Sequence, residues 1–347
     1  MMKHFNIVMI VLCILFNGCK KTATPPDVFP VVQQIVNYDS IYSDKDDIIG
    51  AVINMEIVDN VIITQSENDD YCFSFIDVDK GKLLTKWGKK GQGAEEYVQI
   101  SRSFSVLDRR LVFLDNTKRE LNYVPFSVIL ERDSAAKTVK EPYPETADFR
   151  VRNMVVVGNK KIITGALNKG HFGIIDSENK IIDHPFDYPF SYNEITGIYR
   201  NVVFFSLLKS NNRQRKFAIS ILMSDIFEIY QVNDTNIVRT YISPFNHIPQ
   251  IIKRQGKGLP AHTFDGNNSI AGLSEMSVSE KYICFAYSSE NDDKWRSSGM
   301  EITEILCFDW NGNKIRKYIL PFPIHRFCID DSHIYGLRYF SDTETVI

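Results

Sequence analysis

The chain has 347 residues, of which 44% are apolar, 24% charged and 12% aromatic. This apolar fraction is enough for a hydrophobic core, so the composition excludes a disordered chain. The formal net charge of -3 excludes a strongly basic protein that holds nucleic acid by its phosphates, and we expect no nucleic-acid partner. The length exceeds the usual ~100–200 residues per domain, which allows two domains or one large repetitive domain.

Residues 1–18 predict a lipoprotein signal peptide. Lys3 and His4 form a short polar start, and the uncharged apolar run from Ile7 to Phe16 is too short to span a bilayer as a helix. The segment ends in Phe-Asn-Gly before Cys19, which resembles a bacterial lipobox. We therefore predict that Cys19 is acylated and that this lipid anchor attaches the protein to a membrane. The alternative is an ordinary cleaved signal with a chance cysteine.

Residues 19–30 predict an extended tether, because Pro25, Pro26 and Pro30 fall within them. Lys20 follows the cysteine, so the Asp that would suggest retention in the inner membrane is missing. A run of acidic residues, which would favour display at the cell surface, is missing too. We expect an outer-membrane lipoprotein of the cell envelope that faces the periplasm.

The rest of the chain predicts an all-β fold. Short β-branched or aromatic runs alternate with turn residues, and helical periodicity over eleven or more residues is hard to find. The clearest runs are 61–64, 71–78, 111–114, 155–157, 161–164, 201–208, 217–222, 282–287 and 302–310.

One hairpin pattern recurs at Ile76–Leu83, Ile175–Ile181 and Phe308–Ile315. Each copy has an apolar strand, an Asp, a tight turn rich in Gly or Asn, and a second strand. Asp77 and Asp79 could suggest calcium, but the other ligands of a calcium loop are missing, so a turn is the better interpretation.

About four strands in roughly 45–55 residues is the period of a propeller blade, and it predicts six blades. The predicted blades are 48–97, 98–145, 146–190, 191–247, 248–320 and 321–347. The last is too short for four strands, so we expect Val31 to Tyr42 to supply the missing strand and close the ring. The predicted propeller domain therefore spans 31–347.

A glycine-rich loop carries a family resemblance. Gly88, Gly91, Gly93, Glu96 and Tyr97 fit a Gly-x-x-Gly-x-Gly-Pro-x-Glu-aromatic motif, with Ala94 in place of the Pro. The motif resembles that of the TolB-like six-bladed propeller lipoproteins of Gram-negative bacteria. The resemblance implies the fold and an envelope location, and it transfers no catalytic residues. From the residues themselves, we expect the glycines to turn the chain between blades and Glu96 to accept backbone hydrogen bonds.

The mature chain keeps four cysteines, Cys72, Cys284, Cys307 and Cys328, each inside an apolar strand-like run. We expect at least three of them to be buried small hydrophobes rather than disulfide partners. Neither a C-x-x-C motif nor a Cys/His spacing suggests a metal, and we expect no metal and no cofactor.

Arginines recur just ahead of the predicted first strand of several blades. These are Arg102, Arg150, Arg152, Arg200 and Arg326. The inner strands of a propeller line its channel, so these side chains could form a positive ring at the channel mouth that suits a carboxylate, phosphate or sulfate. The alternative is a set of solvated or locally paired arginines. Blade five offers Ser274 and Glu275 instead.

The long segment from Pro249 to Leu273 predicts a loop that could fold over the channel mouth and contribute His262 or Lys257. A variable insertion is the alternative. The candidate ligand-binding residues are therefore Arg102, Arg152, Arg200, His262 and Arg326.

The sequence lacks a Gly-x-Ser-x-Gly elbow and a His-Glu-x-x-His motif, and its histidines are scattered singly. We therefore expect a ligand- or protein-binding propeller module with an envelope protein or a glycan as partner, and we expect no catalysis. The alternative is a propeller enzyme, a lyase or hydrolase acting on a glycan or peptide at the channel mouth.

Overall fold

The computed structural model describes residues 28–43, 49–133, 137–142, 151–165, 167, 169–176, 178, 180–190, 195, 200, 204–244, 246–254, 261–341 and 344–347. The predicted signal peptide, most of the predicted tether, Cys19, Arg150 and Lys257 lie outside the described residues.

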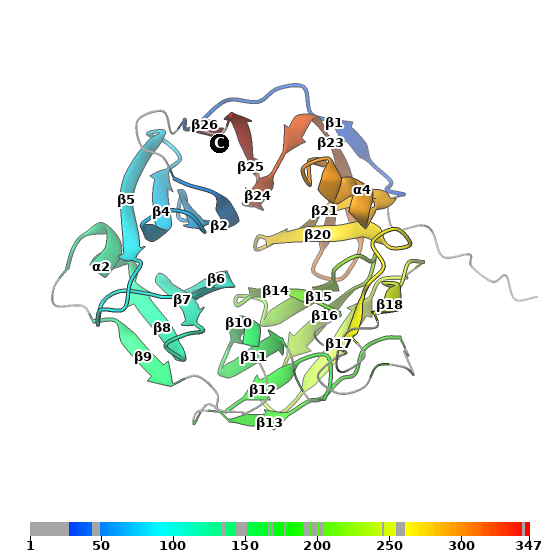
Figure 1. Cartoon of the computed structure of the whole chain (residues 1–347), viewed down its shortest axis with the longest axis horizontal. Helices are drawn as coiled ribbons and strands as arrows, with labels where there is room; N and C mark the ends of the chain where they lie inside the picture. The colour runs from blue at the N-terminus through cyan, green and yellow to red at the C-terminus, as the bar shows by residue number, and fades with distance from the viewer. Residues whose placement is uncertain are drawn as a thin grey trace, which may run out of the picture.

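Six sheets of mainly antiparallel strands stand around a common axis (Figure 1). Each of the first four is a meander of four strands. These are β2 (Val52–Val58), β3 (Val61–Ser66), β4 (Tyr71–Asp77) and β5 (Lys82–Lys89); β6 (Ile100–Leu107), β7 (Arg110–Asp115), β8 (Glu120–Pro125) and β9 (Val139–Pro142); β10 (Val151–Val157), β11 (Lys160–Gly165), β12 (Gly173–Ile175) and β13 (Ile181–Asp183); and β14 (Ser206–Asn211), β15 (Lys216–Ile221), β16 (Phe227–Val232) and β17 (Ile237–Ile242).

The last two sheets depart from this plan. The fifth contains β20 (Ile270–Val278), β21 (Tyr282–Asn291), β22 (Ile302–Asp309), β23 (Lys314–Ile324) and, at its outer edge, β1 (Val32–Gln34). The sixth contains only β24 (Arg326–Ile329), β25 (Ile334–Ser341) and β26 (Glu344–Val346). The predicted six blades and their order are confirmed, and the chain is an all-β propeller.

The first strand of each sheet faces the axis, and each first strand contacts the next one around the ring (Figure 1). The contact between β24 and β2 completes the circle. Aromatic side chains fill the wedges between blades; between blades one and two, the ring of Phe73 lies 5.4 Å from Phe104 and 5.3 Å from Phe113. This burial of apolar surface, worth roughly 25 cal/mol per Å², holds adjacent blades together and fixes their inner strands.

The segment from Val31 to Tyr42 closes the ring, as the sequence predicts, but it does so in two places. Ile41 donates its N–H to Ile347 at 2.7 Å, and Ile347 donates to Tyr42 at 3.0 Å, which adds an outer strand to blade six. Upstream, β1 runs parallel to β23 of blade five. The expectation that the whole segment pairs with the C-terminal strands is therefore wrong for β1, which covers the otherwise open edge of blade five.

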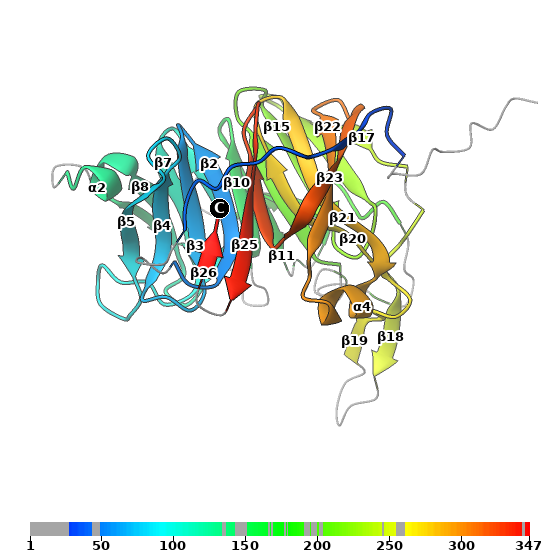
Figure 2. The same cartoon turned by 90° about the horizontal axis from the view of Figure 1, so that it is seen from above.

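The segment from 249 to 273 also differs from its prediction as a loop. It contains the hairpin of β18 (Ile251–Arg254) and β19 (Ala261–Phe264) and the start of β20. The hairpin projects beyond the ring on the side that carries the short helix α4 (Asp292–Ser297) (Figure 2). A second short helix, α2 (Phe126–Leu130), packs on the outside of blades one and two. Among the described residues, no helix is both long and apolar enough to cross a membrane.

The three repeated hairpins share one device. In each, the carboxylate of the Asp accepts backbone N–H groups of the turn: Asp77 from Lys80 at 2.9 Å, Asp176 from Lys180 at 2.8 Å, and Asp309 from Asn313 at 2.9 Å. The turn interpretation of this pattern therefore agrees with the structure.

The cysteine prediction is wrong for one pair. Cys284 and Cys307 form a disulfide, whereas Cys72 and Cys328 are free and buried. The two bonded residues are direct partners in the register of β21 and β22, with Cα atoms 4.2 Å apart. A cross-strand register of this kind brings side chains together that lie 23 residues apart in sequence.

Candidate functional site

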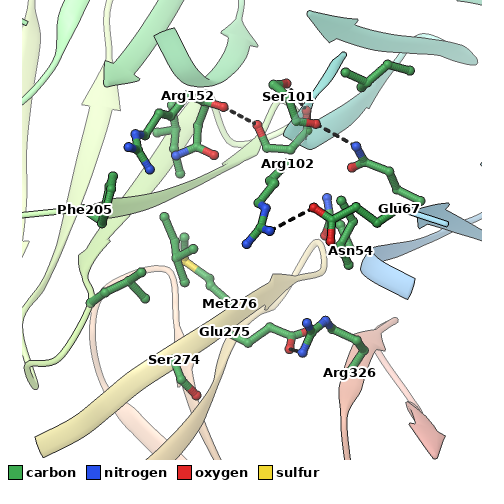
Figure 3. Close-up of a pocket in the computed structure, with 18 of the residues that line it drawn as sticks. Asn54, Glu67, Ser101, Arg102, Arg152, Phe205, Ser274, Glu275, Met276 and Arg326 are labelled. Atoms are coloured by element: carbon green, nitrogen blue, oxygen red, sulfur yellow. Dashed lines mark hydrogen bonds and ion pairs between the residues drawn. The ribbon is translucent and has the colours of Figure 1, made fainter. Parts of the chain in front are cut away.

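The inner strands enclose a cavity of about 760 Å³ on the propeller axis. All six first strands contribute side chains to it, so it belongs to the ring and not to one blade (Figure 3). Its volume falls within the range of ~300–1,000 Å³ typical of small-molecule sites. One lining residue from each first strand, in blade order, is Asn54, Arg102, Arg152, Leu208, Glu275 and Arg326.

The cavity is more positive than the chain as a whole. Six basic side chains face three acidic ones among the described residues that line it, whereas the full sequence carries a formal charge of -3. The basic residues are Lys90, Arg102, Arg152, Lys209, Arg296 and Arg326, and the acidic ones are Glu67, Glu275 and Asp292. Because partly buried charges are weakly screened, this excess favours an anionic ligand.

Arg102 comes from the start of β6 and reaches into the cavity (Figure 3). Its guanidinium pairs with Glu67 at 2.9 Å, and the two side chains are 76% and 51% exposed. An ion pair this exposed is worth little, so a ligand anion can compete with Glu67 for the guanidinium at small cost.

Arg152, the second residue of β10, stacks on an aromatic ring. Its guanidinium carbon lies 3.4 Å from the centroid of Phe205, and both residues line the cavity. Stacking on the ring holds the planar guanidinium in place. Its N–H groups lie at the edge of the guanidinium plane, so the ring does not cover them.

Arg326 begins β24 and lies beside Glu275 of β20, with 3.8 Å between the guanidinium and the carboxylate. The N–H of Phe327 donates to the same carboxylate at 3.1 Å. Burial raises the pKa of Glu275 to about 7, although Arg326 and this N–H favour the ionised form. The net charge of this corner of the cavity therefore changes near neutral pH.

An ion pair crosses the channel itself. Lys209 of β14 contacts Glu56 of β2, and the two side chains are each only 13% exposed. Blades one and four stand opposite each other in a ring of six (Figure 1). The pair therefore bridges the axis, and Lys209 is already neutralised before any ligand binds.

Among the described candidate residues, Arg200 does not line the cavity. Arg200 lies six residues before β14, contacts Asp187, and places its guanidinium 5.1 Å from the ring of Tyr188. Arg200 is therefore locally paired, which is the alternative that the sequence analysis left open. His262 lies in β19 opposite Lys253, within the projecting hairpin, and its side chain lies outside the described part of the structure.

Residues from α4 and its flank also line the cavity. Trp295, Arg296 and Met300 come from this part of blade five. Asn291 caps α4 by accepting the N–H of Lys294, which fixes where the helix begins. The helical turn is only six residues long, and an insertion this short gives little periodic signal in the sequence.

The glycine-rich loop connects β5 to β6. Glu96 accepts the N–H of Gly93 at 2.9 Å, and Tyr97 and Lys89 are joined by a backbone hydrogen bond of 2.9 Å. The Tyr97 side chain is buried against Phe113 and Trp87. The loop thus fixes the point at which β6, and with it Arg102, enters the ring.

A chain of polar side chains leads outward from the cavity between blades three and four. Ser206 Oγ lies 2.8 Å from His171 Nε2, and His171 Nδ1 lies 3.0 Å from Glu228 Oε2. All three residues are buried, and Ser206 is the one that also lines the cavity. These residues are 35 and 57 positions from one another in sequence, so no local motif could have revealed them.

The Glu228 carboxylate is held in its ionised form. Burial alone would raise its pKa, but hydrogen bonds from His171 and Arg239 outweigh burial and keep the pKa below its usual range. The Arg239 guanidinium lies 2.7 Å from the carboxylate oxygen that His171 does not use. In the described part of the chain, no three His, Cys, Asp or Glu side chains are placed to hold a metal ion.

The ring of six sheets and its axial cavity define a six-bladed β-propeller with a polar central site. The TolB-like six-blade propeller family matches residues 32–332, and the chain belongs to this family. The resemblance seen in the glycine-rich loop is thereby confirmed.

Two solved structures share the fold. A protein from Bacteroides fragilis NCTC 9343, inferred to be exported, is 14% identical, with a TM-score of 0.50 over 90% of this chain and 83% of that chain. A member of the DUF4221 family from Bacteroides vulgatus ATCC 8482 is 9% identical, with a TM-score of 0.53 over 89% of this chain and 93% of that chain. Identities this low establish the fold alone. No curated protein matches the sequence significantly.

Proposed function

We propose that this propeller is a binding module whose central cavity takes a ligand carrying a carboxylate, sulfate or phosphate group. The observation that carries the proposal is the convergence of Arg102, Arg152 and Arg326, from blades two, three and six, on one cavity. Guanidinium groups bind planar and tetrahedral anions through paired N–H donors, and three blades can place such donors around one group.

An anionic glycan fragment is the ligand class that fits the proposed envelope location. Phe205 and Trp295 also line the cavity, and aromatic faces of this kind stack on sugar rings. An envelope protein remains the other partner class expected from the sequence, with the same cavity taking an acidic segment of that partner.

Titration calorimetry with a uronate oligosaccharide, a sulfated oligosaccharide and a neutral oligosaccharide of equal length tests the proposal. We expect binding of an anionic member that weakens as salt rises, and a loss of at least about tenfold in Arg152→Gln. Arg213→Gln is the matched control, because Arg213 pairs with Glu280 at the surface and does not line the cavity. Equal binding of the neutral oligosaccharide, or no binding by either anionic one, would contradict the proposal.

We further propose that the protein is an outer-membrane lipoprotein facing the periplasm, anchored through Cys19. The lipobox-like sequence and the following tether support this location, and the anchor would present the propeller to envelope ligands. Metabolic labelling with an alkynyl fatty acid tests it. The label and the membrane association are expected in the natural chain and absent in Cys19→Ser.

A further inference from the structure

We propose that Ser206, His171 and Glu228 form a nucleophile, base and positioning carboxylate that hydrolyse carboxylic esters bound in the central cavity. The inference goes beyond ligand binding and departs from the expectation that no catalysis occurs. It rests on the proposed function only for how the substrate is held, namely through an anionic group near the arginines.

The hydrogen bonds determine the tautomer of the histidine. The ionised Glu228 carboxylate can only accept, so His171 Nδ1 carries the proton and donates it across 3.0 Å. In the neutral imidazole with this tautomer, His171 Nε2 is the acceptor and faces the Ser206 hydroxyl at 2.8 Å. This is the arrangement in which an imidazole can remove the proton of a serine hydroxyl.

The base is held in one orientation by its surroundings. The backbone N–H of His171 donates to Phe186 at 2.8 Å, and the Tyr188 ring lies over the imidazole with centroids 4.3 Å apart. Glu228 is fixed in turn, since it sits within β16 and its second oxygen receives Arg239. Surrounding contacts of this kind keep the functional side chains in the orientation that a reaction requires.

The three side chains lie in a row, with Glu228 in the interior, His171 next to it and Ser206 at the cavity. Ser206 is the first residue of β14, and its carbonyl accepts Asn153 Nδ2 from blade three at 2.6 Å. Of the three, Ser206 lines the cavity, while the imidazole and the carboxylate lie behind it. An ester bound in the cavity, and later a water molecule, would therefore approach the base from the side of Ser206.

Arg152 brings a positive charge to the cavity that Ser206 also lines. Its guanidinium stacks on Phe205, the residue before Ser206, and the Ser103 hydroxyl fixes the Arg152 carbonyl at 3.3 Å (Figure 3). A cation in this cavity favours the anionic group by which the proposed substrate is held.

The proposed reaction conserves atoms and charge. The Ser206 oxygen bonds to the ester carbonyl carbon while its proton moves to His171 Nε2. The carbon–oxygen bond to the alcohol then breaks, and His171 returns the proton to the leaving alcohol. Water attacks the acyl-serine by the same route, which releases the carboxylic acid and restores the hydroxyl of Ser206.

A purely structural role predicts different behaviour. The same hydrogen bonds would join blade three, which holds His171, to blade four, which holds Ser206 and Glu228. The hydroxyl also lies 3.4 Å from the carbonyl of Phe204, a second acceptor for its proton. A structural bridge of this kind needs no reactive hydroxyl, so chemical reactivity separates the two roles.

The test uses the purified full chain, a fluorophosphonate probe, and two esters, p-nitrophenyl acetate and mono-p-nitrophenyl succinate. We expect the probe to attach to Ser206, as located by peptide mass spectrometry, and the succinate ester to be the better substrate. Ser206→Ala is expected to lower hydrolysis at least 100-fold. Ser332→Ala is the matched control, since Ser332 is exposed and does not line the cavity.

Glu228→Gln tests the positioning carboxylate, with an expected fall in kcat at nearly constant KM. A folded natural chain that leaves Ser206 unlabelled, or equal hydrolysis by Ser206→Ala, would overturn the inference, and neither result depends on a variant that fails to fold. Labelling of Ser206 without binding of anionic oligosaccharides would leave the hydrolase intact and refute the proposed ligand. Binding of anionic oligosaccharides without labelling of Ser206 would support the proposed ligand and refute the hydrolase.

Discussion

Glu275 is the ionisable side chain whose environment most affects how the cavity responds to pH. Burial raises its pKa from 4.5 to about 7, while the unfolded chain keeps the ordinary value. Between these two values the folded protein holds a proton that the unfolded chain has lost. The folded state is therefore favoured at low pH by this group, and that contribution is lost as pH rises through 7.

Replacing Glu275 by Gln is expected to remove this part of the pH dependence. Between pH 5 and pH 8, the natural chain should lose about 1–3 kcal/mol of unfolding free energy relative to Glu275→Gln. Urea denaturation at the two pH values measures the difference. Glu280→Gln is the control, because Glu280 is an exposed surface partner of Arg213. Parallel pH profiles for the natural chain and Glu275→Gln would contradict the expectation.

Some residues of the cavity could be predicted from the sequence, and others could not. Arg102, Arg152 and Arg326 were candidates because they stand at the start of predicted inner strands, and the structure places all three at the cavity. Arg200 fails the same rule because blade four begins later, at Ser206. The contacts among Ser206, His171 and Glu228 form only when blades three and four pack, so spacing along the chain carries no trace of them.

The glycine-rich loop shows how one element depends on a missing side chain. A Cβ on Gly91 would lie 2.0 Å from the Glu96 carboxylate, which is the acceptor for the N–H of Gly93. The absence of that carbon is what lets the carboxylate fold into the loop and hold the turn that leads to β6.

Gly91→Ala is expected to lower the unfolding free energy by about 1–2 kcal/mol, because the carboxylate must leave and a backbone donor loses its partner. In a Glu96→Ala background the same change should cost much less. A double-mutant cycle measured by chemical denaturation gives the coupling. Additive effects of the two substitutions would show that Gly91 and Glu96 do not act together.

The bonded strands β21 and β22 provide a second prediction at this scale. Peptide mapping without reduction should recover Cys284 and Cys307 in one linked fragment, with Cys72 and Cys328 as free thiols. Alkylation should reach Cys72 and Cys328 only after denaturation, since both are buried. Free thiols at Cys284 and Cys307 in protein taken from an oxidising compartment would contradict the assignment. The sequence could not reveal this pair, because its apolar setting is the same as that of the two free cysteines.

At the scale of the whole molecule, the two ends of the chain close the ring. Tyr42 is 5% exposed and packs in the cluster that contains Val52 of blade one and Tyr335 and Leu337 of blade six. The strand β1, in contrast, is exposed along its length. The closure therefore depends on the segment that ends at Tyr42 much more than on β1.

Deleting residues through Ser43 is expected to cost about 3–5 kcal/mol of unfolding free energy, as for removal of a large buried aromatic residue, and to promote aggregation. Deletion through Gln34 also removes Phe29, which is 8% exposed and packs on Phe308, and should cost a smaller amount of about 2–3 kcal/mol. Deletion through Asp27 serves as the control. Denaturation curves and light scattering at matched concentration report both effects. Equal stability of all three shortened chains would show that closure does not depend on the N-terminal segment.

The architecture was predictable because it repeats. Four-strand spacing and turn residues recur in every blade, so errors in one strand leave the period intact. The irregular parts were not predictable: the β18–β19 hairpin and α4 each occur once, and the placement of β1 depends on an edge of blade five that exists only after folding.

The pairing of Tyr42 with Ile347 also has a consequence for how the protein folds. The sixth sheet has an open outer edge until these two residues, which lie far apart in sequence, come together. Contacts between such distant positions form late, because long loops must close first. Until that pairing forms, the edge of the sixth sheet can pair with another chain, so the joining of Tyr42 to Ile347 is expected to be a late step that protects the folding molecule from aggregation.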